Sequence, residues 1–319
     1  MTEKKKILII GIAGGLAKIL AGLLVKNKDY EITGVDPRAI TESINHENIT
    51  YKQMRFTRGN FEKLFRDKEF DVVFHLARMS HSHTNPKISL AQRLDINLMG
   101  TKRIMDLSLK FGVKKLVILS TYHVYGALSD NPVFLDEDHP LKASIKYPEL
   151  RDVVEMDQIS TNWMWKNKDN IETVVLRPCS IIGPQIRNTM TKYLTTPYVP
   201  ICMDFNPMFQ FIHEFDMAKI LERSINELPT GIFNVAPDET VSIKKAKQIL
   251  NTPTLPVPSF LLESTAWLLS NSLWSFPRYL IDYIKFSSII DNTLLKAHLG
   301  HEDLFQYSTS DTLELSTLQ

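Results

Sequence analysis

Apolar residues along the first two thirds of the chain form short continuous runs separated by longer amphipathic stretches. The run at 7–10 reads Ile-Leu-Ile-Ile and lacks the polar alternation of a strand with one solvent face, so it predicts a strand covered on both sides. Strands that alternate with helices are typical of βαβ units and a parallel sheet. Further strands are predicted at 30–35, 49–54, 71–75, 115–119, 173–176 and 231–235, and helices at 16–26, 86–110, 153–168 and 243–250.

The pattern changes after Pro178, where prolines become frequent and the regular alternation stops. The segment that follows Pro258 is unusually rich in leucine and tryptophan, but serines, Glu263 and Pro277 interrupt it, so it does not predict a transmembrane span. We interpret it as a helix packed on a smaller domain. Contact with a membrane surface, or a wall for a lipophilic substrate, are the alternatives.

Composition and charge narrow the class of protein. A formal net charge of +1 over 319 residues argues against a nucleic-acid binder, which usually carries a marked basic excess. Two cysteines, without a C-x-x-C pair, favour a reducing cytoplasmic location. Residues 4–17 resemble the basic and apolar regions of a signal peptide, but the glycine turn inside them favours a strand followed by a helix.

The first strand runs directly into a glycine-rich turn, residues 11–17, and then a helix. Gly11 permits the tight turn, Gly14 lets the backbone approach a pyrophosphate, and Ala17 keeps the helix close to the sheet. The N-terminus of the helix offers unpaired N–H groups to phosphates. A turn that serves only packing is the alternative, since a glycine turn by itself is a weak signal.

Asp36 strengthens the case for a dinucleotide site. It ends the second strand, roughly 20 residues beyond the glycine turn, where a carboxylate binds the ribose hydroxyls of NAD. Because that carboxylate repels the additional phosphate of NADP, the sequence favours NAD. Arg38 keeps NADP as the alternative.

Several segments, in consistent order over roughly residues 5–250, resemble motifs of the extended short-chain dehydrogenases of the epimerase/dehydratase kind. They are the glycine turn with its G-x-x-G-x-x-G spacing, Phe74-His75-Leu76-Ala77, Asn97-Leu98-Met99-Gly100-Thr101, Ser120-Thr121-Tyr122-His123-Val124-Tyr125-Gly126, Leu176-Arg177-Pro178 with Gly183-Pro184, Phe211 to Asp216, and Gly231 to Val235.

The resemblance implies an α/β fold with a Rossmann-like, doubly wound parallel sheet and a smaller C-terminal substrate-binding domain. Residues 1–178, with 208–236 returning to them, would form the first domain, and 179–319 mainly the second. It also implies homodimerisation through the helices at 86–110 and 150–168. Cofactor contacts are expected from Gly11, Ala13, Gly14, Gly15, Leu16, Asp36, Arg38, Asn60, Phe61, Leu76, Ala77, Arg78, Asn97 and Pro178.

By the same resemblance, Thr121 would hydrogen-bond the reacting hydroxyl, and a tyrosine followed four residues later by lysine would transfer the proton. Tyr147 and Arg151 have that spacing, with arginine in place of lysine. Arginine still favours a tyrosinate electrostatically, although its planar fork does not replace an ammonium group. An alternative alignment, based on the acidic residues that follow, places Glu149 and Val153 at the two positions and leaves the usual pair missing.

Two functions therefore stay open. One is an NAD-dependent enzyme that acts by hydride transfer on a nucleotide sugar or related small molecule, and the other is a non-catalytic Rossmann protein that senses nucleotide or supports a complex. Expected substrate contacts are His81, His123, Arg187 and Gln210. Gln210 weakens the nucleotide-sugar interpretation, because related sequences often carry arginine there. No metal site is expected, since His81 and His83 have no further ligand at a suitable spacing.

Overall fold

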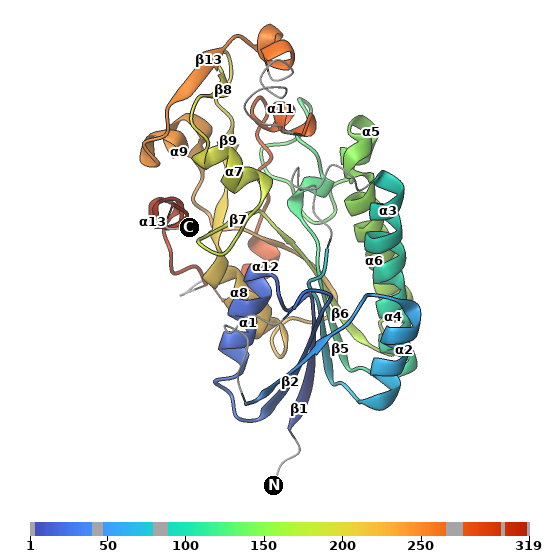
Figure 1. Cartoon of the computed structure of the whole chain (residues 1–319). Helices are drawn as coiled ribbons and strands as arrows, with labels where there is room; N and C mark the ends of the chain where they lie inside the picture. Colours follow the sequence, from blue (N-terminus) through green and yellow to red (C-terminus); the bar gives the residue numbers. More distant parts are fainter. Residues whose placement is uncertain (1–3, 40–46, 79–88, 266–276, 301–303, 318–319) are drawn as a thin grey trace.

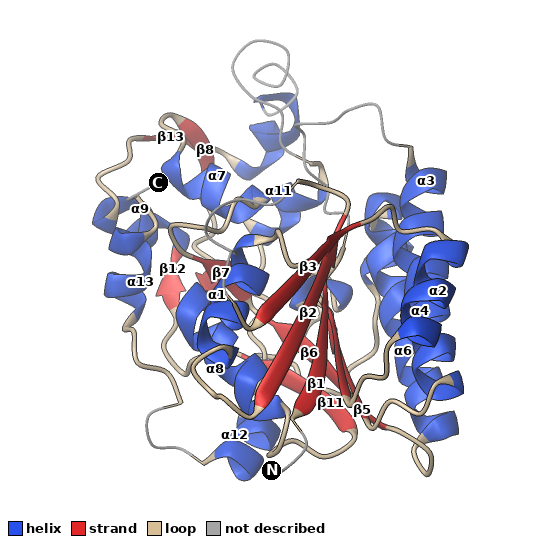
Figure 2. Ribbon diagram, turned by 60° about the horizontal axis from the view of Figure 1, so that its bottom comes forward, coloured by secondary structure: helices blue, strands red, loops and turns tan. Residues whose placement is uncertain are grey.

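Seven parallel strands form the central sheet of the computed structural model, which describes residues 4–39, 47–78, 89–265, 277–300 and 304–317. The strands are β1 (Lys5–Ile10), β2 (Tyr30–Asp36), β3 (Ile49–Gln53), β4 (Val72–His75), β5 (Lys115–Leu119), β6 (Glu172–Pro178) and β11 (Gly231–Val235). Their order in the sheet is β11-β6-β5-β4-β1-β2-β3. Figure 2 shows the sheet with helices on both sides. The Rossmann-like, doubly wound sheet predicted from the sequence is thereby confirmed.

Helices cover both faces of this sheet (Figure 1). One face carries α1 (Gly15–Leu24), α8 (Glu214–Ser224) and α12 (Thr293–Leu299); the other carries α2 (Arg58–Asp67), α4 (Gly100–Lys110) and α6 (Arg151–Asn167). The first strand shows why its apolar run is continuous. Ile7 and Ile9 join the core on one face, and Leu8 and Ile10 join the core on the other.

The helix expected at 86–110 is built in three consecutive parts. These are α3 (Leu90–Leu94), a π-helical turn η2 (Asp95–Met99) and α4, while residues 86–88 lie outside the described ranges. A different helix, α2, is not predicted by the apolar pattern, because it buries only Phe61, Leu64 and Phe65. The side chain of Thr57 caps its first turn by accepting a hydrogen bond from the Asn60 backbone.

Apart from α8, β11 and α12, which belong to the central layers, the described chain beyond Pro178 forms small two-stranded sheets and short helices on top of the strand ends (Figure 1). None of the helices in the described ranges combines the length and the apolar character that crossing a membrane requires. Of the apolar segment after Pro258, residues 266–276 lie outside those ranges. The elements are β7 (Ser180–Ile182) with β10 (Phe211–His213), β8 (Val199–Cys202) with β13 (Thr254–Val257), β9 (Met208–Phe209) with β12 (Val241–Ser242), and the helices α7 (Thr189–Thr195), α9 (Ile243–Ile249), α11 (Tyr279–Tyr283) and α13 (Thr309–Leu315).

Candidate functional site

The candidate site lies at the carboxyl ends of the central strands. Ile10, the last residue of β1, pairs with Val35 of β2 on one side and His75 of β4 on the other. The turn that follows β1 therefore emerges between the ends of β2 and β4. The chain winds outward in opposite directions on either side of this point, which is where open α/β sheets bind their ligands.

The geometry of the glycine turn requires glycine at position 11. Gly11 has a φ of +91°, and a Cβ placed on it would lie 2.9 Å from the Ala77 backbone. Its N–H donates to the Val35 carbonyl at 2.8 Å, while the Gly14 N–H donates to the Gly11 carbonyl at 2.9 Å. The turn is thus pressed against the segment after β4, where Gly11 and Ile12 are buried and residues 13–15 are partly exposed.

Helix α1 begins directly after this turn, with Gly14 as an extended N-cap that provides no side-chain cap. A Cβ on Gly15 would lie 2.2 Å from the Gln185 carbonyl oxygen, so the loop after β7 approaches the first turn of α1 closely. Leu16 is buried under the turn. The first N–H groups of α1 and the partly exposed backbone of residues 13–15 present donors of the kind that bind a pyrophosphate.

Asp36 ends β2 beside this turn, with only 1% of its surface exposed. Its carboxylate accepts the Ala13 N–H at 3.1 Å and a bidentate pair from Arg38, with both donor–acceptor distances at 2.8 Å. Burial raises the pKa of Asp36, but the hydrogen bonds from Arg38 and Ala13 outweigh burial, so the net pKa is lowered. The carboxylate therefore stays ionised at neutral pH.

Other residues expected at the cofactor occupy different parts of this edge. The segment Leu76–Arg78 leaves β4 next to Gly11, with Leu76 and Ala77 partly buried and Arg78 exposed. Pro178 ends β6 and is buried. The Asn60 side chain donates to the Arg55 carbonyl, and Phe61 is buried against Phe56 in the core below α2.

Asn97 lies on the π-helical turn and is 1% exposed. Its amide donates to the carboxylate of Asp152 at 2.7 Å, which joins η2 to α6. His75, the last residue of β4, lies 2.8 Å from the Thr101 hydroxyl, and burial lowers the pKa of the imidazole to about 4. His75 is thus a neutral, hydrogen-bonded core residue.

Thr121 follows β5 and is buried at the strand end. Its Oγ1 lies 2.9 Å from Nδ1 of His123 and also accepts the His123 backbone N–H, which begins the short helix η3 (Tyr122–Val124). The imidazole packs against the rings of Tyr122, Tyr279 and Tyr283, with centroid distances of 4.3, 5.8 and 5.0 Å. The imidazole beside the strand-end threonine is therefore surrounded by aromatic side chains, two of which come from α11.

The structure separates the two other residues expected to act in catalysis. Tyr147 precedes α6 and is buried; its hydroxyl is out of reach of solvent and makes no hydrogen bond within the described part of the chain. The side chain of Arg151 is 58% exposed and forms its ion pair with Glu155, one turn further along α6. Val153, at the lysine position of the alternative alignment, is 3% exposed and belongs to the core.

A buried polar network fixes the wall behind Thr121. Arg177 donates to both carboxylate oxygens of Asp157, at 3.0 and 2.7 Å, and to the Tyr125 hydroxyl at 2.9 Å. That hydroxyl donates to the Asn234 side chain at 2.7 Å, and Ser120 donates to Asp157. This network ties β5, β6 and β11 to α6, so Tyr125 is structural rather than exposed to a ligand.

The substrate contacts expected from the sequence are dispersed. His81 lies outside the described residues, and Arg187 is exposed on the loop between β7 and α7. Gln210 is buried, and its side chain is fully used: it donates to the carbonyls of Pro237 and Ile290 and accepts the Ile290 N–H. Gln210 joins β9 and β10 to the chain after α11.

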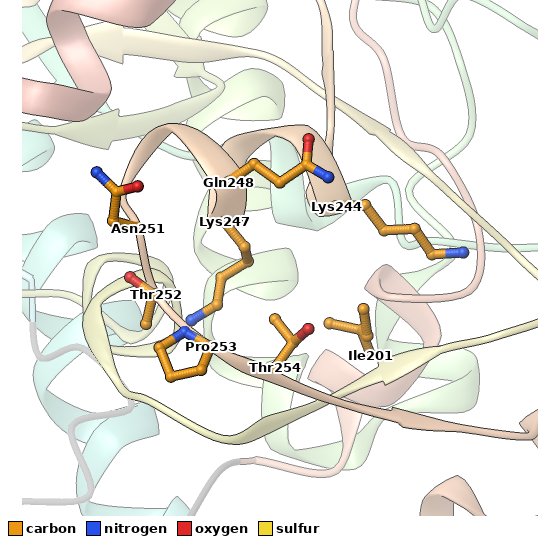
Figure 3. Close-up of a pocket in the computed structure, with 8 residues that line it drawn as sticks. All are labelled: Ile201, Lys244, Lys247, Gln248, Asn251, Thr252, Pro253 and Thr254. Carbon is orange, nitrogen blue, oxygen red and sulfur yellow. The ribbon is translucent and has the colours of Figure 1, made fainter.

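A depression of about 620 Å³ lies away from this edge, between β8, α9 and β13 (Figure 3). Its most buried cation, Lys247, donates all three ammonium protons to the carbonyls of Tyr193, Leu194 and Thr196 at the end of α7. Lys247 therefore caps a helix and offers no hydrogen to a ligand. Among the described residues there is no cluster of three metal-ligating side chains, and Cys179 and Cys202 are buried free thiols.

Two features of the site are missed by the sequence. Tyr279 and Tyr283 of α11 close over His123, and their four-residue spacing on a short helix is the signal that could have indicated it. Glu214, the first residue of α8, has a buried carboxylate. Burial raises its pKa, and hydrogen bonds from the backbone of Gln185 and Ile186 offset part of this increase. Glu214 holds the loop that approaches Gly15.

The sequence was compared with family models and with the sequences of known proteins. The family model described as NAD dependent epimerase/dehydratase matches residues 7–236. An uncharacterised protein of Mycobacterium tuberculosis is 26% identical over 247 residues, which cover 75% of this chain and 64% of that protein. The chain thus matches less than two thirds of that relative's length. Protein CapI of Staphylococcus aureus is 26% identical over 244 residues, 70% of each chain.

Solved structures agree over almost the whole chain. A UDP-glucose 4-epimerase from Thermotoga maritima superposes with a TM-score of 0.73 at 19% identity, covering 98% of this chain and 97% of that chain. A dTDP-glucose 4,6-dehydratase from Bacillus anthracis, solved in complex with NAD, superposes with a TM-score of 0.73 at 17% identity, covering 98% and 95%. At these identities the likeness establishes the fold.

Proposed function

The chain belongs to the NAD dependent epimerase/dehydratase family, and from this premise we propose that it is an NAD-dependent enzyme that oxidises and reduces a hydroxyl-bearing carbon of a nucleotide sugar or related small molecule. The observation that carries the proposal is the juxtaposition at the carboxyl edge of the sheet. The glycine turn and the start of α1 follow β1, the ionised Asp36 ends the neighbouring β2, and Thr121 follows β5, which β4 separates from β1 in the same sheet.

Each part of this edge has a separate task in binding NAD. The backbone from Ala13 to Leu16 and the positive end of α1 would hold the pyrophosphate, and Asp36 the ribose hydroxyls. Because the carboxylate of Asp36 stays ionised, NAD is favoured over NADP. Arg38 would bind the additional phosphate only after leaving its ion pair with Asp36. When bound, NAD supplies the acceptor of the hydride that leaves the substrate carbon.

The residues of this chain then bind and orient the substrate. Thr121 offers its hydroxyl to the reacting oxygen, and the aromatic side chains of η3 and α11 exclude water from it. The pair Tyr147 and Arg151 remains a proposal for proton transfer. It requires movement, because the structure places the Tyr147 hydroxyl in the interior and the Arg151 guanidinium on the surface.

A non-catalytic role is the second candidate, and this separation of Tyr147 from Arg151 is the observation that favours it. Purified protein incubated with NAD and, in turn, UDP-glucose, UDP-glucuronic acid and dTDP-glucose distinguishes the two. The proposal expects a changed sugar nucleotide by chromatography, with transient absorbance of reduced nicotinamide. Binding of NAD without any conversion across this panel and its 4-epimers would favour the non-catalytic role.

A further inference from the structure

The hydroxyl of Thr121 and the imidazole of His123 form a direct hydrogen bond, with 2.9 Å between Oγ1 and Nδ1. The contact is held from two sides. The backbone N–H of His123 donates to the same Oγ1, and the Tyr283 hydroxyl donates to the His123 carbonyl at 3.3 Å. Local geometry and a contact from a distant segment therefore both keep the imidazole against the threonine.

The position of His123 suits proton transfer better than that of Tyr147. His123 is partly exposed at the strand edge, whereas the Tyr147 hydroxyl is out of reach of solvent. The cation four residues after Tyr147 is on the surface with Glu155. Imidazole exchanges a proton near neutral pH without the help of a neighbouring cation, which a tyrosine needs.

We infer that His123 takes up and returns the proton of the reacting hydroxyl through Thr121, an assignment that rests on the proposed function. During oxidation the substrate O–H bond breaks and its proton passes to Thr121 Oγ1, while the hydroxyl proton of Thr121 passes to Nδ1 of His123. The imidazole, neutral with its proton on Nε2, becomes an imidazolium. The electron pair of the substrate C–H bond leaves as hydride, for which bound NAD would supply the acceptor, and a carbonyl remains. Reduction returns both protons along the same path.

Three tyrosines pack against the imidazole of His123. Tyr122 lies beside it on η3, and Tyr279 and Tyr283 face it from α11. Burial raises the pKa of all three tyrosines, to about 12 for Tyr279, so they are neutral where imidazole titrates. Beside the effect of burial, the charge of Arg78 lowers the pKa of Tyr279, and the charge of Asp282 raises the pKa of Tyr283.

The test compares wild type with His123→Gln, whose amide can still form a hydrogen bond with Thr121 but cannot carry the proton. The matched control is His298→Gln, which replaces an exposed histidine on α12. On whichever sugar nucleotide of the panel wild type converts, His123→Gln should lose at least about 100-fold in kcat, a usual size for a lost acid–base group. Binding of NAD should be unchanged by calorimetry. The low-pH limb of kcat/KM for oxidation should disappear.

Either of two results would overturn the inference while the proposed function stands. One is a His123→Gln enzyme with the rate and pH profile of wild type. The other comes from ¹⁵N spectra of the histidine side chains, assigned with His123→Gln. Replacing Thr121 by valine should shift the His123 Nδ1 resonance, whereas serine should restore it; an Nδ1 signal indifferent to valine removes the proposed path. Absence of conversion by wild type on every sugar nucleotide removes the proposed function itself, and the inference with it.

Discussion

Asp157 of α6 and Arg177 of β6 form a bidentate ion pair in the interior, with Nη2–Oδ1 and Nε–Oδ2 distances of 2.7 and 3.0 Å. Both side chains are almost fully buried. The pair fixes which face of α6 meets the sheet. Val153, one turn earlier, therefore faces the core, while Arg151 faces solvent. This explains why the two possible alignments of α6 have such different consequences for the catalytic assignment.

Replacing Asp157 by alanine should destabilise the protein by about 3–5 kcal/mol, because the buried guanidinium of Arg177 would lose its partner. Denaturant unfolding of the variant measures the loss. Glu155→Ala, which removes the partly exposed partner of Arg151 on the same helix, is the control and should cost less than about 1 kcal/mol. Equal losses in both variants would contradict the structural role of the buried pair.

The sheet could be predicted from the sequence because its inner strands, such as β1, β4 and β5, contain continuous apolar runs and the predicted helices are amphipathic. The glycine turn and Asp36 could also be predicted, because they lie close together in the sequence. Residues brought together from distant segments could not. Helix α11 packs over His123, and Gln210 binds the backbone of Ile290. Both contacts join residues that are 80 or more positions apart in the sequence.

Gly15→Ala should weaken NAD binding by about tenfold or more, equivalent to roughly 1.4 kcal/mol. A Cβ at this position lies 2.2 Å from the Gln185 carbonyl oxygen, so the loop must move or the first turn of α1 must distort. Gly22→Ala, on the same helix with no atom within 4 Å of its new Cβ, is the control. It should leave binding intact and add about 0.5–1 kcal/mol to stability. If the two variants bind NAD alike, the start of α1 is not the pyrophosphate site.

Asp36→Asn should reduce the affinity for NAD and bring it closer to that for NADP. The substitution removes the negative charge that the Arg38 and Ala13 hydrogen bonds keep ionised. Calorimetry with both dinucleotides measures the ratio. Glu31→Gln, a more exposed carboxylate at the other end of β2, should leave it unchanged. An unaltered preference in Asp36→Asn would place the ribose contact elsewhere.

Glu214 should make stability depend on pH. Burial raises its pKa, so the folded state binds the proton more tightly than the unfolded state, and stability falls as pH rises from the unfolded pKa toward the folded one. Glu214→Gln removes this fall, so its stability relative to wild type should increase across the same range, measured by denaturant unfolding from pH 4 to about 8. Glu227→Gln should do the opposite, because Arg223 lowers the pKa of Glu227. Parallel pH curves for Glu214→Gln and wild type would contradict the assignment.

The most direct test of an NAD-dependent function is calorimetric titration of the purified chain with NAD and NADP, after denatured protein has been checked for nucleotide carried through purification. Binding of NAD in preference to NADP, or NAD released on denaturation, is the predicted result. If neither dinucleotide binds and none is released, the glycine turn and Asp36 do not form a cofactor site, and the proposed oxidation chemistry is wrong.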